Sequence, residues 1–265
     1  MGALKLLNAF SNRLEVTAYI LRTPKVTATV RLALLADLHG CYYGPGQREL
    51  VEAIDEAAPH AVLYAGDMLD DRLPHDHTRT LFRELQGRYP AYYAAGNHEF
   101  WNHRLQPYRE IVEQYGIRVL AGEAVLLQTP QGQRVAIAGV EDPAAGRAGF
   151  DRQLAAVAHS VDPAVYTILL SHRPEKRQDY RPIGVDLVLS GHAHGGQWRL
   201  PRLLEQGLLA PNQGLFPAFT NGLQQEAGTS YIVSRGLAKE STRWVPRMFN
   251  QPQLVIIQLE PGAYS

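Results

Sequence analysis

Cysteine, unbalanced charge and long apolar runs are all scarce in this 265-residue sequence. It contains a single cysteine, Cys41. One thiol excludes an intramolecular disulfide and is typical of a protein from a reducing compartment. Lysine and arginine balance aspartate and glutamate at 26 each, so the formal net charge is zero. This balance does not draw the protein toward polyanions, and we expect no sequence-specific nucleic-acid partner.

The sequence also lacks a run of about 18 consecutive apolar residues, which argues against a membrane-spanning helix. Residues 1–13 are too short and too interrupted by polar residues for the apolar core of a signal peptide. We expect them to form a short helix or a surface segment, which leaves peripheral membrane contact open. The sequence therefore predicts a cytoplasmic protein, either free or peripherally associated with a membrane.

Short apolar runs of the buried-strand type alternate with segments of helical spacing. Strand–helix–strand order with short connections implies parallel pairing, and adjacent strands in the second half indicate mixed sheets. We predict one α/β domain over residues 1–265, with a long loop at 200–226 that contains three prolines. Helices are predicted at 47–58, 76–87, 105–115 and 150–159. The strand at 14–21 is predicted to pair antiparallel. Further strands are predicted at 26–30, 32–36, 61–65, 91–95, 119–120, 124–127, 134–138, 165–170, 185–190, 229–233 and 253–259.

The most informative stretch follows the apolar run 185–190 and reads Gly-His-Ala-His-Gly-Gly-Gln over residues 191–197. Side chains alternate along a strand, so His192 and His194 leave the strand end on the same side. The flanking glycines let the backbone turn sharply and approach a ligand closely. Taken alone, the motif could be a polar turn with solvated histidines, and only further ligand residues at other strand ends favour a metal site.

Four other segments end in such residues, each directly after an apolar run. The full set of candidate ligands is Asp37, His39, Asp67, Asn97, His172, His192 and His194. Oxygen and imidazole donors without thiolates suit Mn, Fe, Zn, Co or Ni and disfavour a structural zinc–thiolate site. Seven donors are too many for one ion but suit two, and a bridging Asp67 would place the ions about 3.5–4 Å apart, ready for phosphoryl displacement.

In chain order these residues match the blocks D-x-H, G-D, G-N-H-[DE], H and G-H-x-H between residues 37 and 194. This pattern resembles the calcineurin-like metallophosphoesterase superfamily. Four further segments resemble its bacterial YkuE/YaeI-like phosphodiesterase branch: Ser171–Glu175, Gly195–Gln197, Ser234–Gly236 and Phe249–Pro252.

The resemblance implies a four-layer αββα sandwich of two mixed β-sheets flanked by helices. It places one metal ion on Asp37, His39, Asp67 and His194, and a second on Asp67, Asn97, His172 and His192. It also makes His98 a catalytic residue that stabilises the phosphate or protonates the leaving oxygen, while Glu99 orients His98 or nearby backbone. The cofactors would be two divalent or trivalent ions drawn from Mn, Fe, Zn or Ni.

The implied activity is hydrolysis of a phosphodiester, pyrophosphate or phosphomonoester bond by a metal-bridging hydroxide, with phosphodiesters favoured. The substrate would be a small or lipid-linked phosphate ester. Arg235 is a candidate phosphate ligand, because a guanidinium matches phosphate oxygens bidentately, and the 200–226 loop is a candidate wall of the substrate site. The alternative is a non-catalytic scaffold with the same fold.

Two acidic residues beside the second block, Asp70 and Asp71, have two interpretations. They could be further metal ligands, or they could form a solvated acidic turn. The second interpretation is favoured here, because acidic turns on the surface are common.

Overall fold

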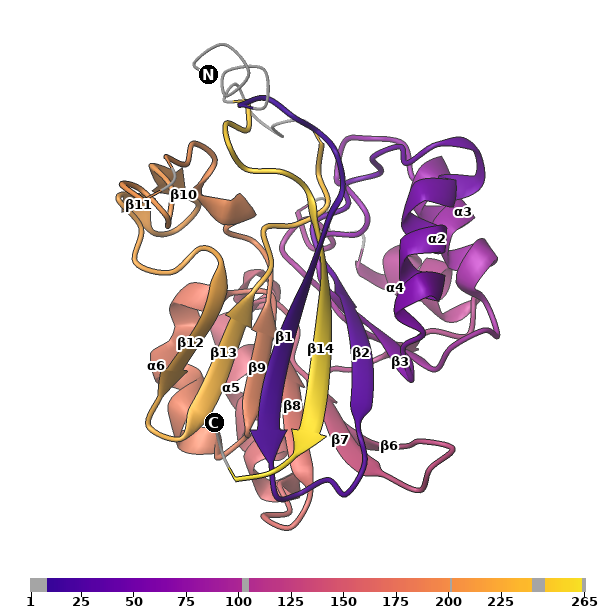
Figure 1. Cartoon of the computed structure of the whole chain (residues 1–265), viewed down its shortest axis with the longest axis vertical. Helices are drawn as coiled ribbons and strands as arrows, with labels where there is room; N and C mark the ends of the chain where they lie inside the picture. Colours follow the sequence, from indigo (N-terminus) through magenta and orange to yellow (C-terminus); the bar gives the residue numbers. More distant parts are fainter. Residues whose placement is uncertain (1–8, 102–104, 201, 240–245, 264–265) are drawn as a thin grey trace.

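The fold is built on two six-stranded mixed sheets (Figure 1). The computed structural model describes residues 9–101, 105–200, 202–239 and 246–263. The first sheet has the order β1 (Glu15–Thr23), β14 (Gln253–Pro261), β2 (Val30–Leu35), β3 (Ala61–Ala65), β4 (Ala91–Ala94) and β5 (Arg118–Val119). The second has the order β12 (Gly222–Glu226), β13 (Thr229–Val233), β9 (Leu187–Ser190), β8 (Tyr166–Leu170), β7 (Arg134–Gly139) and β6 (Ala124–Gln128).

Helices cover the outer face of each sheet. The first sheet is covered by α2 (Arg48–Ala57), α3 (Asp76–Leu85) and α4 (Leu105–Glu113), and the second by α5 (Arg147–Ser160) and the short α6 (Arg177–Tyr180) (Figure 1). The predicted α/β class with four αββα layers is therefore confirmed.

Alternation of side chains along the strands explains these layers. In β2, Leu32 and Leu34 point into the core between the two sheets, whereas Ala33 and Leu35 point into the core beneath α2 and α3. From Leu32 to Leu35 the strand is buried on both faces and needs apolar residues at every position, which is why this stretch reads as a continuous apolar run.

Parallel pairing brings the ends of the central strands together. β2, β3 and β4 are parallel neighbours in the first sheet, and β7, β8, β9 and β13 are parallel neighbours in the second. The loops after β2, β3, β4, β8 and β9 carry every candidate metal ligand. The fold thus gathers the predicted residues at one edge of the sandwich.

Three expectations about local structure differ from the observed fold. β1 pairs in parallel with β14, not antiparallel, because its partner comes from the far end of the chain. Residues 26–29 of the expected strand at 26–30 are irregular with a bend at 27–28, and β2 begins only at Val30. Residues 200–226 contain the hairpin β10 (Leu209–Ala210) and β11 (Gly214–Leu215) and the edge strand β12, so this segment is not a bare loop.

Candidate metal centre

The predicted ligands converge at the meeting point of the two sheets. Each lies two to four residues beyond its strand, and each side chain is at most 6% exposed: Asp37, His39, Asp67, Asn97, His172, His192 and His194. Two groups of them hold nitrogen and oxygen atoms within 4.8 Å of one another: Asp37, His39 and His194, and Asp67, His172 and His192.

Asp67 belongs to the second group and also faces the first. Its Oδ2 is 3.0 Å from His172 Nε2 and 3.8 Å from His39 Nε2. One carboxylate oxygen therefore faces an imidazole of each group, which is the position that a bridging ligand requires.

The backbone at the ligands is strained. Asp37, His39, Asp67, His192 and His194 all have φ between 46° and 67°. This left-handed region is uncommon for residues with a Cβ and costs on the order of 1–3 kcal/mol at each position. The sharp turns it produces aim successive side chains into one small volume.

Glycines beside the ligands allow very close packing. A Cβ on Gly96 would lie 2.2 Å from Asp67 Oδ1, and a Cβ on Gly191 would lie 2.5 Å from Asp37 Oδ2. These distances explain why glycine precedes Asn97 and His192 in the sequence: a larger residue would push a carboxylate out of the site.

Hydrogen bonds set the tautomers of two ligand histidines. His172 Nδ1 donates to the carbonyl oxygen of Ala65 at 2.7 Å, and His39 Nδ1 donates to Asp70 Oδ2 at 2.8 Å. Both imidazoles must therefore present a lone pair at Nε2 when neutral. In the described part of the chain, these two Nε2 atoms and Asn97 Oδ1 are buried without a hydrogen-bond partner. Of these, His39 Nε2 and Asn97 Oδ1 are orphaned buried donors of electron pairs that suit metal ions, whereas His172 Nε2 lies 3.0 Å from Asp67 Oδ2.

His192 is oriented by Asn212, a residue that the sequence analysis missed. His192 Nε2 lies 2.8 Å from Asn212 Oδ1, which also accepts a hydrogen bond from Arg173 Nη1. His192 Nε2 also lies 3.1 Å from Arg173 Nη1, so it is held between a donor and an acceptor. Asn212 belongs to the 200–226 segment and lies in no motif, so no sequence signal could have identified it.

Charge at the centre favours added cations. Burial lowers the pKa of His172, but the carboxylates of Asp67 and Asp37 outweigh this effect and raise it to about 10. Burial, together with neighbouring cationic groups, lowers the pKa values of His192 and His194 well below the usual range and keeps both imidazoles neutral. The buried carboxylates and the neutral imidazoles of His192 and His194 are suitable ligands for divalent ions, and a bound ion would replace the proton that His172 otherwise carries.

His98 lies at the rim, held by two acidic residues. Its Nδ1 is 2.7 Å from Asp71 Oδ1 and 3.3 Å from Asp70 Oδ2. Burial lowers its pKa, but a hydrogen bond to Asp70 and the charges of Asp67, Asp70 and Asp71 raise it to about 9. The exposed ring of Trp101 packs 4.4 Å from the imidazole, centroid to centroid.

The expectation that Asp70 belongs to a solvated turn is wrong. Asp70 is 4% exposed. Its Oδ2 faces His39 and His98, and its Oδ1 accepts from the amides of Arg72 and Leu73. The sequence feature that could have indicated a buried Asp70 is its position three residues after Asp67, in the same loop after β3.

Glu99 binds backbone rather than histidine. Its carboxylate accepts hydrogen bonds from the amides of Asp67, Leu69 and Gly96 and from the hydroxyl of Tyr93. It thereby ties the loop after β3 to the loop after β4. Burial and the charge of Asp67 raise the pKa of Glu99 to about 7.

Arg235, the candidate phosphate ligand, points away from the ligand groups. It is 7% exposed, and its Nη2 lies 2.9 Å from Glu15 Oε2 at the start of β1. Another buried guanidinium, that of Arg247, is closer to the centre: its Nη2 donates to the Arg235 carbonyl at 2.7 Å and lies 3.5 Å from His194 Nδ1.

Comparison with known proteins agrees with this geometry. The family model described as calcineurin-like phosphoesterase matches residues 30–196, more than half of the chain. The chain belongs to this family.

This phosphoesterase is 26% identical over 216 residues to the uncharacterized metallophosphoesterase YkuE of Bacillus subtilis, covering 80% of this chain and 72% of YkuE. It is 32% identical over 206 residues to an uncharacterized metallophosphoesterase of Aquifex aeolicus, covering 72% of this chain and 75% of the relative. The predicted resemblance to YkuE is thus confirmed.

Solved structures share the fold of this phosphoesterase at low sequence identity. A 5′-nucleotidase precursor from Thermus thermophilus superposes with a TM-score of 0.51 at 17% identity, over 79% of this chain. This chain spans 49% of that nucleotidase. TT1561, also from Thermus thermophilus, gives a TM-score of 0.51 at 13% identity and matches 79% of this chain and 91% of its own.

Family membership makes the protein a metal-dependent phosphoester hydrolase. In the part of the chain that the structure describes, no helix is long and apolar enough to cross a membrane.

Proposed function

We propose that this phosphoesterase hydrolyses phosphodiesters of small or lipid-linked molecules with two metal ions. One ion would be held by Asp37, His39, Asp67 and His194, and the other by Asp67, Asn97, His172 and His192. Bound ions supply Lewis acidity to the phosphoryl group and activate a water molecule. The observation that carries the proposal is the convergence of seven buried oxygen- and nitrogen-bearing side chains from both sheets, of which His39 Nε2 and Asn97 Oδ1 have no hydrogen-bond partner among the described residues.

His98 would supply the proton for the leaving oxygen. A pKa of about 9 leaves its imidazole protonated at neutral pH. Because Nδ1 is held by Asp70 and Asp71, the acidic proton is the one on Nε2, which lies 4.0 Å from Asp67 Oδ2 and so faces the ligand groups. Departure of an alkoxide requires such a proton donor.

Charge near the centre favours a diester over a monoester. A monoester carries two negative charges at neutral pH, whereas a diester carries one. The guanidinium groups of Arg173 and Arg235 each pair with a carboxylate, those of Asp142 and Glu15. These two cations are therefore engaged and do not neutralise the second charge of a monoester, whereas Arg247 Nη1 is buried without a hydrogen-bond partner in the described part of the chain.

Hydrolysis of bis-p-nitrophenyl phosphate and p-nitrophenyl phosphate, with added Mn²⁺ and with chelator, tests the reaction class. We expect chelator-sensitive cleavage, with a higher kcat/KM for the diester. A higher kcat/KM for the monoester would refute the diester preference. Absence of cleavage across Mn, Fe, Zn and Ni, with fewer than about one ion bound per chain, would favour a scaffold.

The role of His98 is tested with diesters that differ only in the leaving group. His98→Ala should lower kcat by about 100-fold or more on a methyl ester, and much less on a p-nitrophenyl ester, whose leaving oxygen needs no proton. The matched control is His159→Ala, because His159 is exposed and bonds only to the Ala155 carbonyl oxygen. Equal losses on both substrates would contradict general acid catalysis by His98.

A further inference from the structure

The most exposed apolar side chains gather on one projection of the molecule. Among the described residues, the three most exposed large apolar side chains are Leu203 at 85%, Phe216 at 70% and Leu215 at 67%. Leu215 lies in β11, Phe216 follows it, and Leu203 lines the same hollow as Phe216 and Pro217. We call Leu203, Leu215 and Phe216 the apolar tip.

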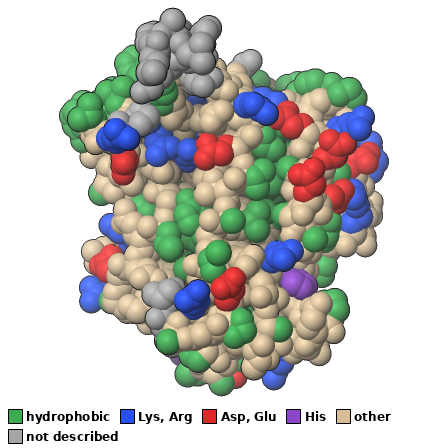
Figure 2. Space-filling model, in the orientation of Figure 1, with side chains coloured by type: hydrophobic (Ala, Val, Ile, Leu, Met, Phe, Trp, Pro, Cys, Tyr) green, Lys and Arg blue, Asp and Glu red, His purple; other side chains and the backbone are tan. Residues whose placement is uncertain are grey.

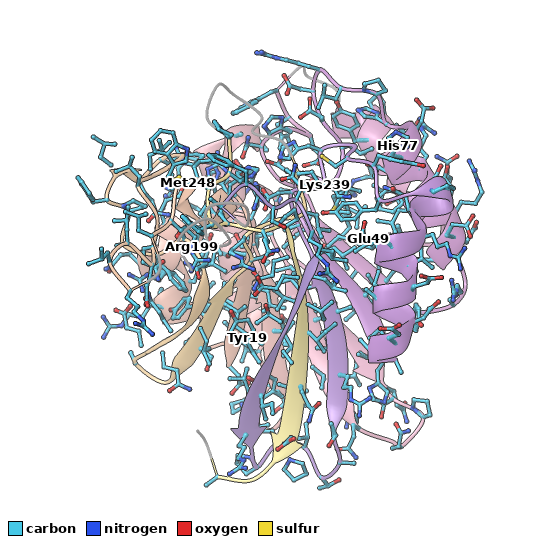
Figure 3. All side chains as sticks on the ribbon, turned by 45° about the horizontal axis from the view of Figure 1, so that its top comes forward. Tyr19, Glu49, His77, Arg199, Lys239 and Met248 are labelled. Carbon is cyan, nitrogen blue, oxygen red and sulfur yellow. The ribbon has the colours of Figure 1, made fainter. Side chains whose placement is uncertain are left out.

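The apolar tip is continuous with a second exposed apolar strip. Trp198 and Leu200 are 38% and 41% exposed, and Trp198 pairs with Met248 through an isolated bridge. The neighbouring Phe249 donates its amide to the Ala9 carbonyl, which places the 58% exposed Phe10 beside this strip. Figure 3 shows Arg199 and Met248 close together, and Figure 2 shows hydrophobic side chains gathered over β10 and β11.

Water-exposed side chains of this size, clustered on a hairpin, are costly unless something covers them. Arg202 is exposed directly beside Leu203, and Glu205 lines the same hollow, while the guanidinium of Arg199 bonds to the Glu205 carbonyl and to Asn221. Apolar side chains bordered by an exposed arginine match the interface of an anionic bilayer.

We propose that the apolar tip inserts into the headgroup region of an anionic membrane. A second copy of this chain is a weaker candidate, because the tip exposes only on the order of 450 Å², about half of the ~800 Å² that each partner of a stable dimer buries. The segment that bears the tip also carries Asn212, which contacts the ligand histidine His192. Membrane docking would therefore place the metal centre next to the lipid surface.

Vesicle sedimentation tests this inference without any substrate, so its outcome does not depend on the proposed function. Wild-type protein should sediment with phosphatidylcholine vesicles that contain phosphatidylglycerol, and more weakly with pure phosphatidylcholine vesicles. The double variant Leu203→Asp/Phe216→Asp should bind at least about tenfold more weakly. Arg202→Glu should reduce binding to anionic vesicles by about fivefold and leave binding to neutral vesicles unchanged.

The matched control is Leu126→Asp, because Leu126 is 46% exposed on β6, at the opposite end of the molecule (Figure 1). It should bind vesicles like the wild type. Absence of wild-type binding to both vesicle types would overturn the proposal, as would equal binding by the double variant. A wild-type dimer in light scattering that becomes monomeric in the double variant, without vesicle binding, would assign the tip to self-association instead.

Discussion

The hydrogen bond from His39 Nδ1 to Asp70 keeps the proton of His39 on Nδ1 and its lone pair on Nε2. A substitution of Asp70 that preserves its shape but removes this acceptor should therefore weaken metal binding. In Asp70→Asn, the side-chain oxygen can still accept from the backbone N–H groups of Arg72 and Leu73, whose nitrogens lie 2.8 and 2.9 Å from Asp70 Oδ1. The side-chain NH₂ must then face His39 Nδ1–H. Two donors would meet there, and neither can accept a hydrogen bond. His39 recovers a hydrogen bond only by moving its proton to Nε2, and this removes the lone pair that faces the cleft.

The size of the effect follows from the bond that is lost. A hydrogen bond to a charged group contributes about 1.5–3 kcal/mol. Affinity for the ion held by Asp37, His39 and His194 should therefore fall about tenfold to 100-fold, as is common for residues that orient metal ligands. Isothermal titration of the metal-free protein with Mn²⁺ measures this change, and the free energy of unfolding in urea shows whether the variant is folded.

Asp71→Asn separates metal binding from catalysis. Asp71 Oδ1 contacts Nδ1 of His98, which is not one of the predicted metal ligands, at 2.7 Å. This variant should bind Mn²⁺ like the wild type while its kcat falls. Wild-type affinity for both ions in Asp70→Asn would refute the tautomer argument, and so would equal loss of affinity in the two variants.

Three further predictions concern other parts of the site. Asn212→Ala should weaken the ion near His192 about tenfold in a Mn²⁺ titration, and unchanged affinity would argue against a positioning role. Gly96→Ala should lower the free energy of unfolding in urea by about 1–3 kcal/mol, whereas Gly149→Ala, whose new Cβ meets nothing closer than 3.9 Å, should not lower it. Trp101→Ala should raise KM for an aromatic diester about fivefold or more and leave KM for a dimethyl ester nearly unchanged. The reason is that only an aromatic group can stack on the exposed indole ring. Equal changes in both KM values would contradict stacking.

The candidate ligands could be read from the sequence. A strand buried on both faces is mostly apolar, so β2, β3 and β8 stand out before their polar ends. Each candidate ligand follows such a strand, and parallel pairing places the strand ends at one edge. These are local patterns, which is why seven candidate positions could be named, whereas the four layers were expected from the resemblance to metallophosphoesterases.

Contacts between distant segments could not be predicted in this way. β1 alternates like an antiparallel strand, but its partner β14 lies more than 200 residues away and runs parallel to it. Asn212 meets His192 only because the 200–226 segment folds back over the loop after β9.

The sequence by itself determined which residues could bind metal ions, because ligand chemistry depends on residue type and on position after a strand. Only the tertiary structure decided which imidazole nitrogen faces the cleft and that Asp70 is buried. Those properties depend on hydrogen bonds between residues far apart in the chain, such as Asp70 with His39 and Ala65 with His172. A tautomer is set by the partner of the second ring nitrogen, and the partner is known only once the chain has folded.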